Sequence, residues 1–269
     1  MRGLFASHPR PGRSVSVERP EETRPQREAH VETNPERKVA LIDGAGNSLG
    51  RAIALELARA GYRIALSDAE HRLARFGSFE ALREQGSEPL LLPWREGEQP
   101  ARRSWEALGR LDCLVHLLVP LPEMAPEELY VRPMRVLASG LAAAELLSGT
   151  PEPGVIITHC PLPAAYVGTG FEDCLPAVRG AMTGATRSLC RRLGARGISA
   201  NCIQTGLLEM PEARELESAR VRPLKAPVGR RGTPEDMARL TTFLVRRNRY
   251  LTGQALLLDG GQTSGITGT

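Results

Sequence analysis

Short apolar runs alternate with amphipathic stretches from Lys38 to near the end of the chain. The runs predict seven buried strands, at Val39–Ile42, Arg63–Ser67, Leu90–Leu92, Cys113–Leu118, Val155–Thr158, Ile198–Ile203 and Ala255–Leu258. The stretches between them predict six helices, at Leu49–Ala60, Glu70–Gln85, Arg102–Leu108, Met134–Leu147, Pro176–Leu193 and Pro234–Val245. Strands that are apolar on both faces and separated by helices are typical of a parallel sheet covered on both sides. We therefore expect an α/β fold, a three-layer Rossmann-like doubly wound parallel sheet of about seven strands.

The first 36 residues have a different character. They are rich in Pro, Arg and Glu and poor in large apolar side chains, so they cannot bury enough surface to offset the entropy of ordering. We expect a disordered tail over residues 1–36 and one domain over residues 37–269. Residues 1–17 contain no acidic residue and faintly resemble a mitochondrial transit peptide, but Pro9 and Pro11 would interrupt an amphipathic helix there. The expected location is the cytoplasm, with the mitochondrial matrix as the alternative.

Composition and charge exclude several classes of function. The net charge of +4 is spread along the chain, which argues against a nucleic-acid-binding protein. The sequence contains no apolar run of about 18 residues, so it predicts no membrane span. The five cysteines form no C-x-x-C pair, and the His, Cys, Asp and Glu residues show no metal-ligand spacing. We expect neither a membrane protein nor a metalloprotein.

The turn after the first predicted strand has the form of a nucleotide-binding loop. It reads Asp43-Gly44-Ala45-Gly46-Asn47-Ser48-Leu49-Gly50 and opens a helix, so backbone N–H groups and the helix N-terminus could face a pyrophosphate. The candidate cofactor-binding residues are Gly44, Asn47, Ser48, Leu49 and Gly50, together with Asp68 at the end of the second strand. An acid at that point could accept hydrogen bonds from the adenosine ribose and would repel a 2′-phosphate, which favours NAD(H) over NADP(H). Alternatively, Asp68 is a solvated turn acid or a helix N-cap.

Several further motifs resemble those of the short-chain dehydrogenase/reductase family over roughly residues 38–266. They are the turn at Gly44–Gly50, the stretch from Thr186-Arg187-Ser188-Leu189 to Asn201, and a C-terminal region. That region contains Gly229-Arg230-Arg231-Gly232-Thr233-Pro234-Glu235-Asp236, Tyr250-Leu251-Thr252-Gly253-Gln254 and Asp259-Gly260-Gly261. The Gly-Ala-x-x-x-Leu-Gly form of the turn is also similar to the pteridine-reductase branch. The resemblance implies a Rossmann fold, a nicotinamide cofactor and a dimer interface formed by the helices Met134–Leu147 and Pro176–Leu193.

The catalytic positions depart from the family pattern. In the register set by Thr186–Leu189, the family's catalytic Tyr and Lys correspond to Leu175 and Arg179, and Thr158–Leu162 offers no Ser. The small residues that follow the fourth strand in the family are replaced by His116-Leu117-Leu118-Val119, the family's helix Asn by Gly140, and a Thr after the sixth strand by Met210. Asp43 replaces a Thr and would place negative charge near a pyrophosphate. Because Leu175 can neither donate nor accept a proton, we expect hydride transfer to be lost.

Two kinds of function remain open. The first is a pseudoenzyme that serves as a structural or regulatory subunit or as a nucleotide-binding module, either in a homo-oligomer or in a heteromer with an active paralogue. The small residues of the two helices at the expected interface allow close packing. The alternative is an NAD(P)H-dependent oxidoreductase of carbonyl, acyl or pteridine substrates with relocated acid–base groups, for which Tyr166, His116 and Arg179 are the candidates. Cys160 is interpreted as a buried core thiol rather than a nucleophile.

Overall fold

The computed structural model describes residues 36–75, 79–95, 97–120, 124–148, 152–162, 171, 173–213 and 226–264. They belong to one unit, Val31–Thr269. The predicted disordered tail, apart from Glu36, lies outside the described residues, and so does Tyr166.

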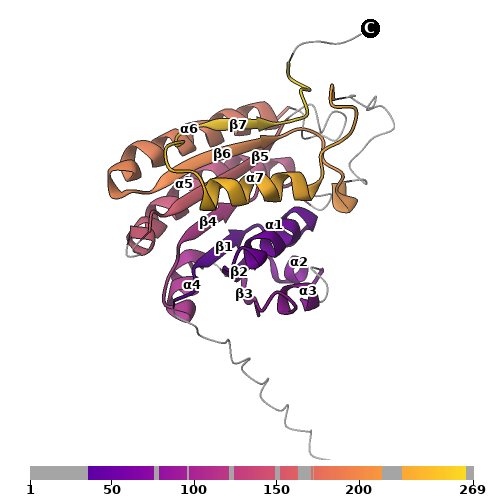
Figure 1. Ribbon diagram of the computed structural model, residues 1–269. Helices are drawn as coiled ribbons and strands as arrows, with labels where there is room; N and C mark the ends of the chain where they lie inside the picture. The colour runs from indigo at the N-terminus through magenta and orange to yellow at the C-terminus, as the bar shows by residue number, and fades with distance from the viewer. Residues whose placement is uncertain are drawn as a thin grey trace, which may run out of the picture. The chain divides into compact units, whose positions relative to one another are not determined.

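Seven parallel strands form one sheet (Figure 1). They are β1 Val39–Asp43, β2 Arg63–Asp68, β3 Leu90–Pro93, β4 Cys113–His116, β5 Val155–Pro161, β6 Ser199–Thr205 and β7 Ala255–Leu258. Their order is β3-β2-β1-β4-β5-β6-β7, so the chain reverses its direction of winding between β1 and β4. The crevice at such a reversal, outside the carboxyl ends of the strands, is the usual ligand site of this architecture. The predicted fold class is confirmed.

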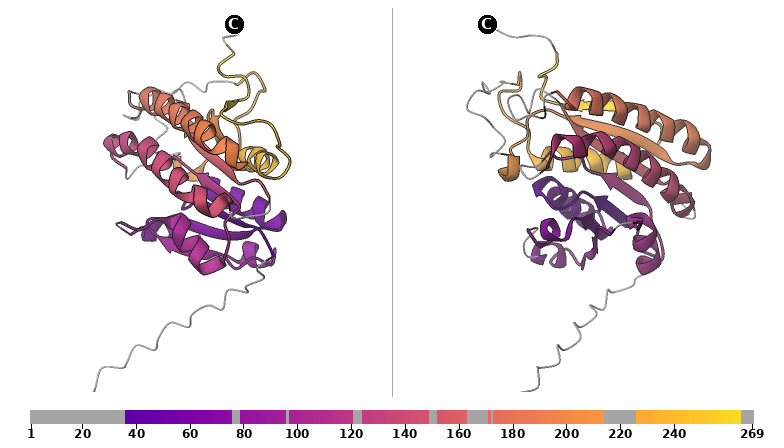
Figure 2. Two further views of the ribbon diagram at one scale, coloured as in Figure 1. Left: turned by 90° about the vertical axis from the view of Figure 1, so that its left-hand side faces the viewer. Right: turned by 180° about the vertical axis from the view of Figure 1, so that it is seen from behind.

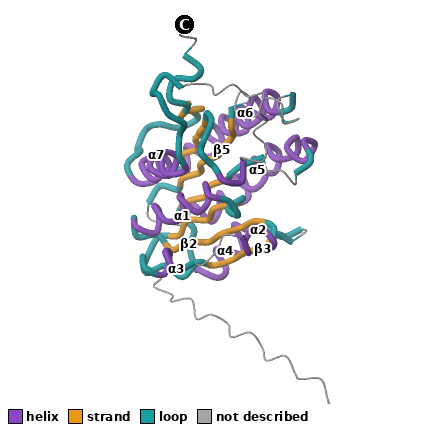
Figure 3. The backbone as a smooth tube through the Cα atoms, turned by 90° about the vertical axis from the view of Figure 1, so that its right-hand side faces the viewer, coloured by secondary structure: helices purple, strands orange, loops and turns teal. Residues whose placement is uncertain are grey.

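Helices cover both faces of the sheet (Figures 2 and 3). One layer contains α1 Ser48–Arg59 and α7 Pro234–Arg246, and the other contains α4 Pro100–Leu108, α5 Pro126–Ser148 and α6 Leu175–Leu193. The alternation of side chains along β1 explains both layers, because Ala40 and Ile42 pack on the α1 side while Val39 and Leu41 pack on the α5 side. By the same alternation, Asp43 belongs to the face that α4 and α5 cover.

Two predicted helices differ from those observed. The stretch predicted as one helix, Glu70–Gln85, contains two short ones, α2 Glu70–Arg75 and α3 Glu80–Arg83. Poor helix formers, Gly77 and Ser78, lie in the sequence between them. The predicted helix Met134–Leu147 begins earlier, at Pro126, and runs through Pro133. Proline suits a first helical position, and Glu127 and Glu128 favour the first turn. Among the described residues, no helix is both long and apolar enough to cross a membrane.

The described residues also contain two short 3-10 helices. η2, Gly194–Arg196, links α6 to β6, and η3, Pro211–Ala213, follows β6. η3 is important for the site described below because it brings Glu212 close to the N-terminus of α1.

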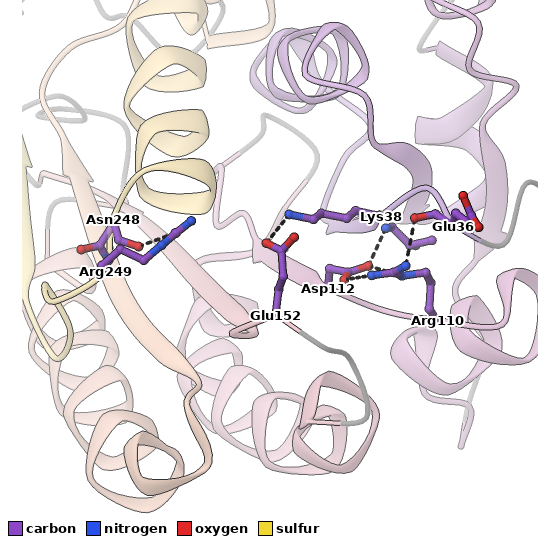
Figure 4. A network of polar contacts seen from close by, with 8 residues as sticks. Glu36, Lys38, Arg110, Asp112, Glu152, Asn248 and Arg249 are labelled. Carbon is purple, nitrogen blue, oxygen red and sulfur yellow. Dashed lines mark hydrogen bonds and ion pairs between the residues drawn. The ribbon is translucent and has the colours of Figure 1, made fainter.

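A polar network joins the segments that precede β1 and β4 (Figure 4). Asp112 accepts a hydrogen bond from the backbone N–H of Val39 (2.8 Å) and two from the Arg110 guanidinium (2.8 and 2.5 Å). Lys38 forms an ion pair with Glu152. These contacts lie at the amino ends of the strands, the opposite edge of the sheet from the ligand crevice, so they belong to the scaffold.

Candidate functional site

The glycines of the turn between β1 and α1 are required by close packing. Gly44 has φ of +82°, and a Cβ there would lie 2.4 Å from the carbonyl oxygen of Leu117. A Cβ on Gly50 would lie 2.2 Å from the carbonyl oxygen of Ala45. Asn47 is the N-cap of α1, and its side chain accepts a hydrogen bond from the Gly50 N–H. The turn therefore has the shape that the sequence predicts.

The amides of this turn are already engaged within the chain. The N–H groups of Gly44 and Ala45 donate to the carbonyl of Ser67, at 2.8 and 3.1 Å. The N–H of Asn47 donates to the carbonyl of Ala45 (2.7 Å). Gly46 and Ser48 donate to carboxylates, described next. Each of the five successive N–H groups from Gly44 to Ser48 thus has an acceptor, and none of the five is left to grip a pyrophosphate.

A carboxylate of the chain itself occupies the N-terminus of α1. Glu212 accepts a hydrogen bond from the Ser48 N–H (2.5 Å) and another from the Ser48 hydroxyl (2.9 Å). The N-terminus of a helix stabilises an anion through its unpaired N–H groups and the helix dipole. Glu212 therefore supplies the negative charge that a bound phosphate would otherwise bring.

Asp68 is likewise satisfied internally. It is 1% exposed, and its two oxygens accept the N–H groups of Gly46 (2.9 Å) and Ala69 (2.7 Å). Arg72 lies 3.5 Å away as its ion-pair partner. Burial raises the pKa of Asp68, and these hydrogen bonds and the Arg72 charge oppose the rise. In this geometry Asp68 holds the turn against α2, and its predicted ribose contact stays a prediction.

Side chains fill the groove beside the turn. Leu118, Val119 and Met124 are all buried there. Among the described residues there, one cavity of about 10 Å³ is lined by Gly44, Asn47, Asp68, Arg72, Leu117, Leu118, Val119, Met124 and Arg132. That volume holds roughly one water molecule, whereas pockets for drug-sized ligands measure about 300–1,000 Å³. The cavity that these described residues line is therefore far smaller than a dinucleotide.

The positions of the family's Tyr and Lys are built into the scaffold. Leu175 is fully buried at the start of α6. Arg179, one turn later, donates to the side-chain oxygen of Gln204 on β6 (2.7 Å). Cys160 is buried, and burial raises the pKa of its thiol, which agrees with the prediction of a core thiol rather than a thiolate nucleophile.

His116 lies on the other side of β4 from the helix α1. Its Nδ1 is 3.1 Å from Asp43 Oδ2, and the Trp94 indole N–H donates to Asp43 Oδ1 (2.9 Å). Burial raises the pKa of Asp43, but hydrogen bonds from His116 and Trp94 and the charges of His116 and Arg132 lower it to below its ordinary value. An ionised carboxylate only accepts, so Nδ1 carries a proton and faces Asp43. Two donors thus engage the Asp43 carboxylate on the α5 face, and its predicted effect on a pyrophosphate stays a prediction.

A larger cavity opens beside this Asp43–His116 pair. It measures about 530 Å³ and lies between the segment after β3, helix α4 and helix α5. Its lining includes four arginines, Arg95, Arg103, Arg132 and Arg135, together with Trp94 and the apolar side chains of Leu117, Leu118 and Val136. Arg132, Leu117 and Leu118 also line the closed groove, so they form the wall between the two spaces.

Sequence reasoning did not find Glu212, Trp94 or Arg132. Glu212 lies in a segment without periodicity, and nothing local marks it as a partner of Ser48. Arg132 lies before the start of the predicted helix Met134–Leu147, and in the observed helix the i, i+3 spacing of Arg132 and Arg135 places both on one face. His116 was a candidate, and the structure pairs it with Asp43. Among the described residues, no cluster of His, Cys, Asp and Glu could hold a metal ion.

Comparison with known proteins identifies the family. The family described as Enoyl-(Acyl carrier protein) reductase matches residues 44–263. The BbsC subunit of (2S)-[(R)-hydroxy(phenyl)methyl]succinyl-CoA dehydrogenase from Thauera aromatica is 29% identical over 87% of this chain and 98% of its own length. The L-rhamnose 1-dehydrogenase (NAD(P)(+)) of Azotobacter vinelandii is 27% identical over 83% of this chain and 96% of its own.

Solved structures agree with these relatives. A short-chain dehydrogenase/reductase from Serratia marcescens superposes with a TM-score of 0.68 at 25% identity, covering 84% of this chain and 97% of that one. The strand order, the glycine turn and the sequence match therefore all point the same way, and this chain belongs to the short-chain dehydrogenase/reductase family.

Proposed function

We propose that this chain is a non-catalytic member of its oxidoreductase family that serves as a subunit in an assembly with a second short-chain dehydrogenase chain. The observation that carries the proposal is the closed groove, in which Glu212 takes the anion position at α1 and Leu118, Val119 and Met124 fill the space. Leu175 and Arg179 at the family's catalytic positions support it, because a buried Leu offers no proton to a carbonyl.

An exposed apolar surface supports the role of subunit. On α5, Tyr130, Val131 and Met134 are 53%, 48% and 66% exposed. The neighbouring helix α6 presents a stripe of exposed small residues, Ala177, Gly180, Ala181 and Gly184. Large apolar side chains beside small ones suit a close helix–helix contact. The Thauera relative is itself named as a subunit, and a second chain of the same fold is the occupant we propose.

A turnover assay and a binding assay together test the proposal. Purified protein should show no oxidation of NADH or NADPH above buffer with ketone, acyl or dihydropterin substrates. NAD(H) and NADP(H) should also leave the melting temperature unchanged. A ligand that binds would raise it, because at 100 times its Kd it adds about 2.7 kcal/mol to the free energy of unfolding. Cofactor-dependent stabilisation without turnover would identify a nucleotide-binding module instead of a subunit without cofactor.

The second candidate is a working reductase with relocated acid–base groups, which the names of the relatives favour, since several are dehydrogenases or reductases. Its signature is substrate-dependent NAD(P)H oxidation by the unmodified protein that Tyr166→Phe or His116→Ala abolishes. That result would replace the first proposal. The preferred cofactor in this case is NAD(H), given the acid at Asp68.

A further inference from the structure

We infer that the cavity between α4 and α5 is a binding site for a small organic dianion, a phosphate monoester or a dicarboxylate with an apolar part. The inference stands apart from the proposed assembly, since it concerns a space separated from the cofactor groove. It begins with the volume of about 530 Å³, which is the size of an ordinary small-ligand pocket, about 300–1,000 Å³.

Two guanidiniums at this cavity have no carboxylate partner. Arg132 and Arg135 lie one turn apart on α5 and both line the cavity. Within the part of the chain that the structure describes, no carboxylate lies in ion-pair range of either one. By contrast, Arg103 pairs with Glu98 (3.1 Å) and donates to the carbonyl of Pro93 (2.7 Å). The lining as a whole has four arginines and two carboxylates, Asp43 and Glu98, so it carries an excess of positive charge.

The environment of Arg132 makes a bound anion favourable. Its guanidinium lies over the Trp94 ring, 4.5 Å from the centroid, which fixes its plane. Burial lowers the pKa of Arg132; among the nearby charges Asp43 and Asp68 oppose this most strongly, and Arg72 and Arg135 lower the pKa to a smaller extent. A guanidinium in a partly desolvated place gains from contact with an anion. A dianion between Arg132 and Arg135 would supply that contact to both, since guanidinium groups bind phosphate and carboxylate with paired hydrogen bonds.

A third polar group faces the same space. His116 lines the cavity and is 3% exposed, and its Nε2 has no hydrogen-bond partner among the described residues. Its Nδ1 is held by Asp43, so the ring orientation is fixed. Buried polar atoms are nearly always paired, and an Nε2 without a partner beside two arginines that have no carboxylate in ion-pair range among the described residues points to a ligand at this place. Nε2 can accept a hydrogen bond from a ligand hydroxyl or, when the ring is protonated, donate one to the anion.

The apolar part of the lining selects against inorganic ions. Leu117, Leu118, Val136 and Trp94 are among the side chains that line the cavity. A ligand that buries apolar surface there gains about 25 cal/mol per Å² in addition to its charge contacts. The site is therefore better suited to an organic phosphate or dicarboxylate than to phosphate alone.

Isothermal titration of the full chain tests this site with four probes. Phenyl phosphate and phthalate each carry an aromatic ring and an anionic head, inorganic phosphate lacks the ring, and phenol lacks the charge. We expect phenyl phosphate or phthalate to bind, and inorganic phosphate and phenol to bind more weakly or not at all. Tighter binding of phenyl phosphate would identify a phosphate monoester as the ligand class, and tighter binding of phthalate a dicarboxylate. Failure of both aromatic anions to bind overturns the inference.

Matched arginine variants locate the site. Arg135 is exposed, so the variant Arg135→Gln should fold normally. It should nevertheless weaken binding roughly tenfold or more, as expected for the loss of a charged hydrogen bond. Arg51→Gln changes an exposed arginine on α1, on the opposite face of the sheet, and should leave binding unchanged. Equal losses in the two variants would show binding by general charge and contradict the site. Binding of NAD⁺ that Arg135→Gln abolishes would mean that the cavity is part of a dinucleotide site, and would overturn this inference and the proposed function together.

Discussion

Glu212 and Ser48 are 164 positions apart in the chain, and the carboxylate of one caps the helix that begins with the other. This contact joins η3, on the segment after β6, to the N-terminus of α1. The N-terminus of a helix is a favourable place for an anion, and in this structure the chain's own carboxylate occupies it.

Removing this carboxylate should destabilise the protein. Glu212→Ala deprives the Ser48 N–H of its acceptor, and loss of such a cap costs about 0.5–2 kcal/mol. Urea denaturation of the variant and of wild-type protein measures the difference. Glu209→Ala is the matched control, because Glu209 is an exposed acid in the same segment. Equal effects of the two substitutions would show that Glu212 acts through general charge and not as a cap.

The contrast between the predicted and observed site has a physical basis. Strands, helices and the glycine turn depend on local periodicity and backbone conformation, which the sequence displays directly, and β1, β2 and β7 were placed within a residue of their observed ends. The contacts that close the groove join distant segments, as Glu212 does with Ser48. No periodicity encodes such a pairing. The bulk of Leu118 and Val119 was visible in the sequence, but their burial in the groove required the fold.

Restoring the family's catalytic pair should not restore activity. The double variant Leu175→Tyr with Arg179→Lys supplies the proton donor and the ammonium, but under the proposed function the groove still lacks room for the cofactor. A catalytic Tyr and Lys act together with the bound cofactor, so restoring the two side chains does not restore the reaction when the cofactor cannot bind. NADH oxidation should stay at background, and circular dichroism should check folding because Tyr must replace a fully buried Leu. Turnover well above background would refute the view that the groove is closed.

A glycine on the exposed face of α6 offers a test of assembly. A Cβ at Gly180 would meet no atom within 4 Å, so Gly180→Leu should leave the subunit folded while overpacking a close helix contact by about 1–3 kcal/mol. Light scattering should then report a smaller assembly, with Gly180→Ala as the mild control. Gly140→Leu should instead impair folding, since a Cβ there lies 2.9 Å from Leu189 Cδ2. An assembly that Gly180→Leu leaves intact would remove α6 from the interface.

The capping box of α7 should contribute stability that is lost in acid. Asp236 accepts from Thr233 N–H (2.9 Å) and pairs with Arg230 and Arg239. The hydrogen bond from Arg230 is the largest influence and holds the pKa of Asp236 below its ordinary value of 3.8. A depressed pKa stabilises the folded state above the unfolded pKa, and this contribution declines as the pH falls below about 4. Asp236→Asn should therefore cost about 1 kcal/mol at pH 7 and little near pH 2, as measured by denaturant unfolding. A constant difference across that range would contradict the ionic origin.

A buried histidine on β5 should make the fold sensitive to mild acid in a separate range of pH. His159 is 2% exposed, and its Nε2 lies 2.8 Å from Thr205 Oγ1. Burial lowers its pKa from 6.5 to about 3. Above pH 6.5 the ring is neutral in both the folded and the unfolded states, and its full contribution is present. As the pH falls below 6.5 only the unfolded state takes up the proton, so the free energy of unfolding declines by up to about 1.4 kcal/mol per pH unit until the folded state titrates as well.

The variant His159→Gln isolates this contribution, because Gln cannot titrate but can still reach the Thr205 hydroxyl. Chemical denaturation at pH 7.5 and 5.5 should show that wild-type protein loses about 1.4 kcal/mol more than the variant between those values. The carboxylate of Asp236 titrates lower, so it adds little to this interval. Wild-type and variant proteins with the same loss of stability would show that the imidazole of His159 is open to protonation in the folded state.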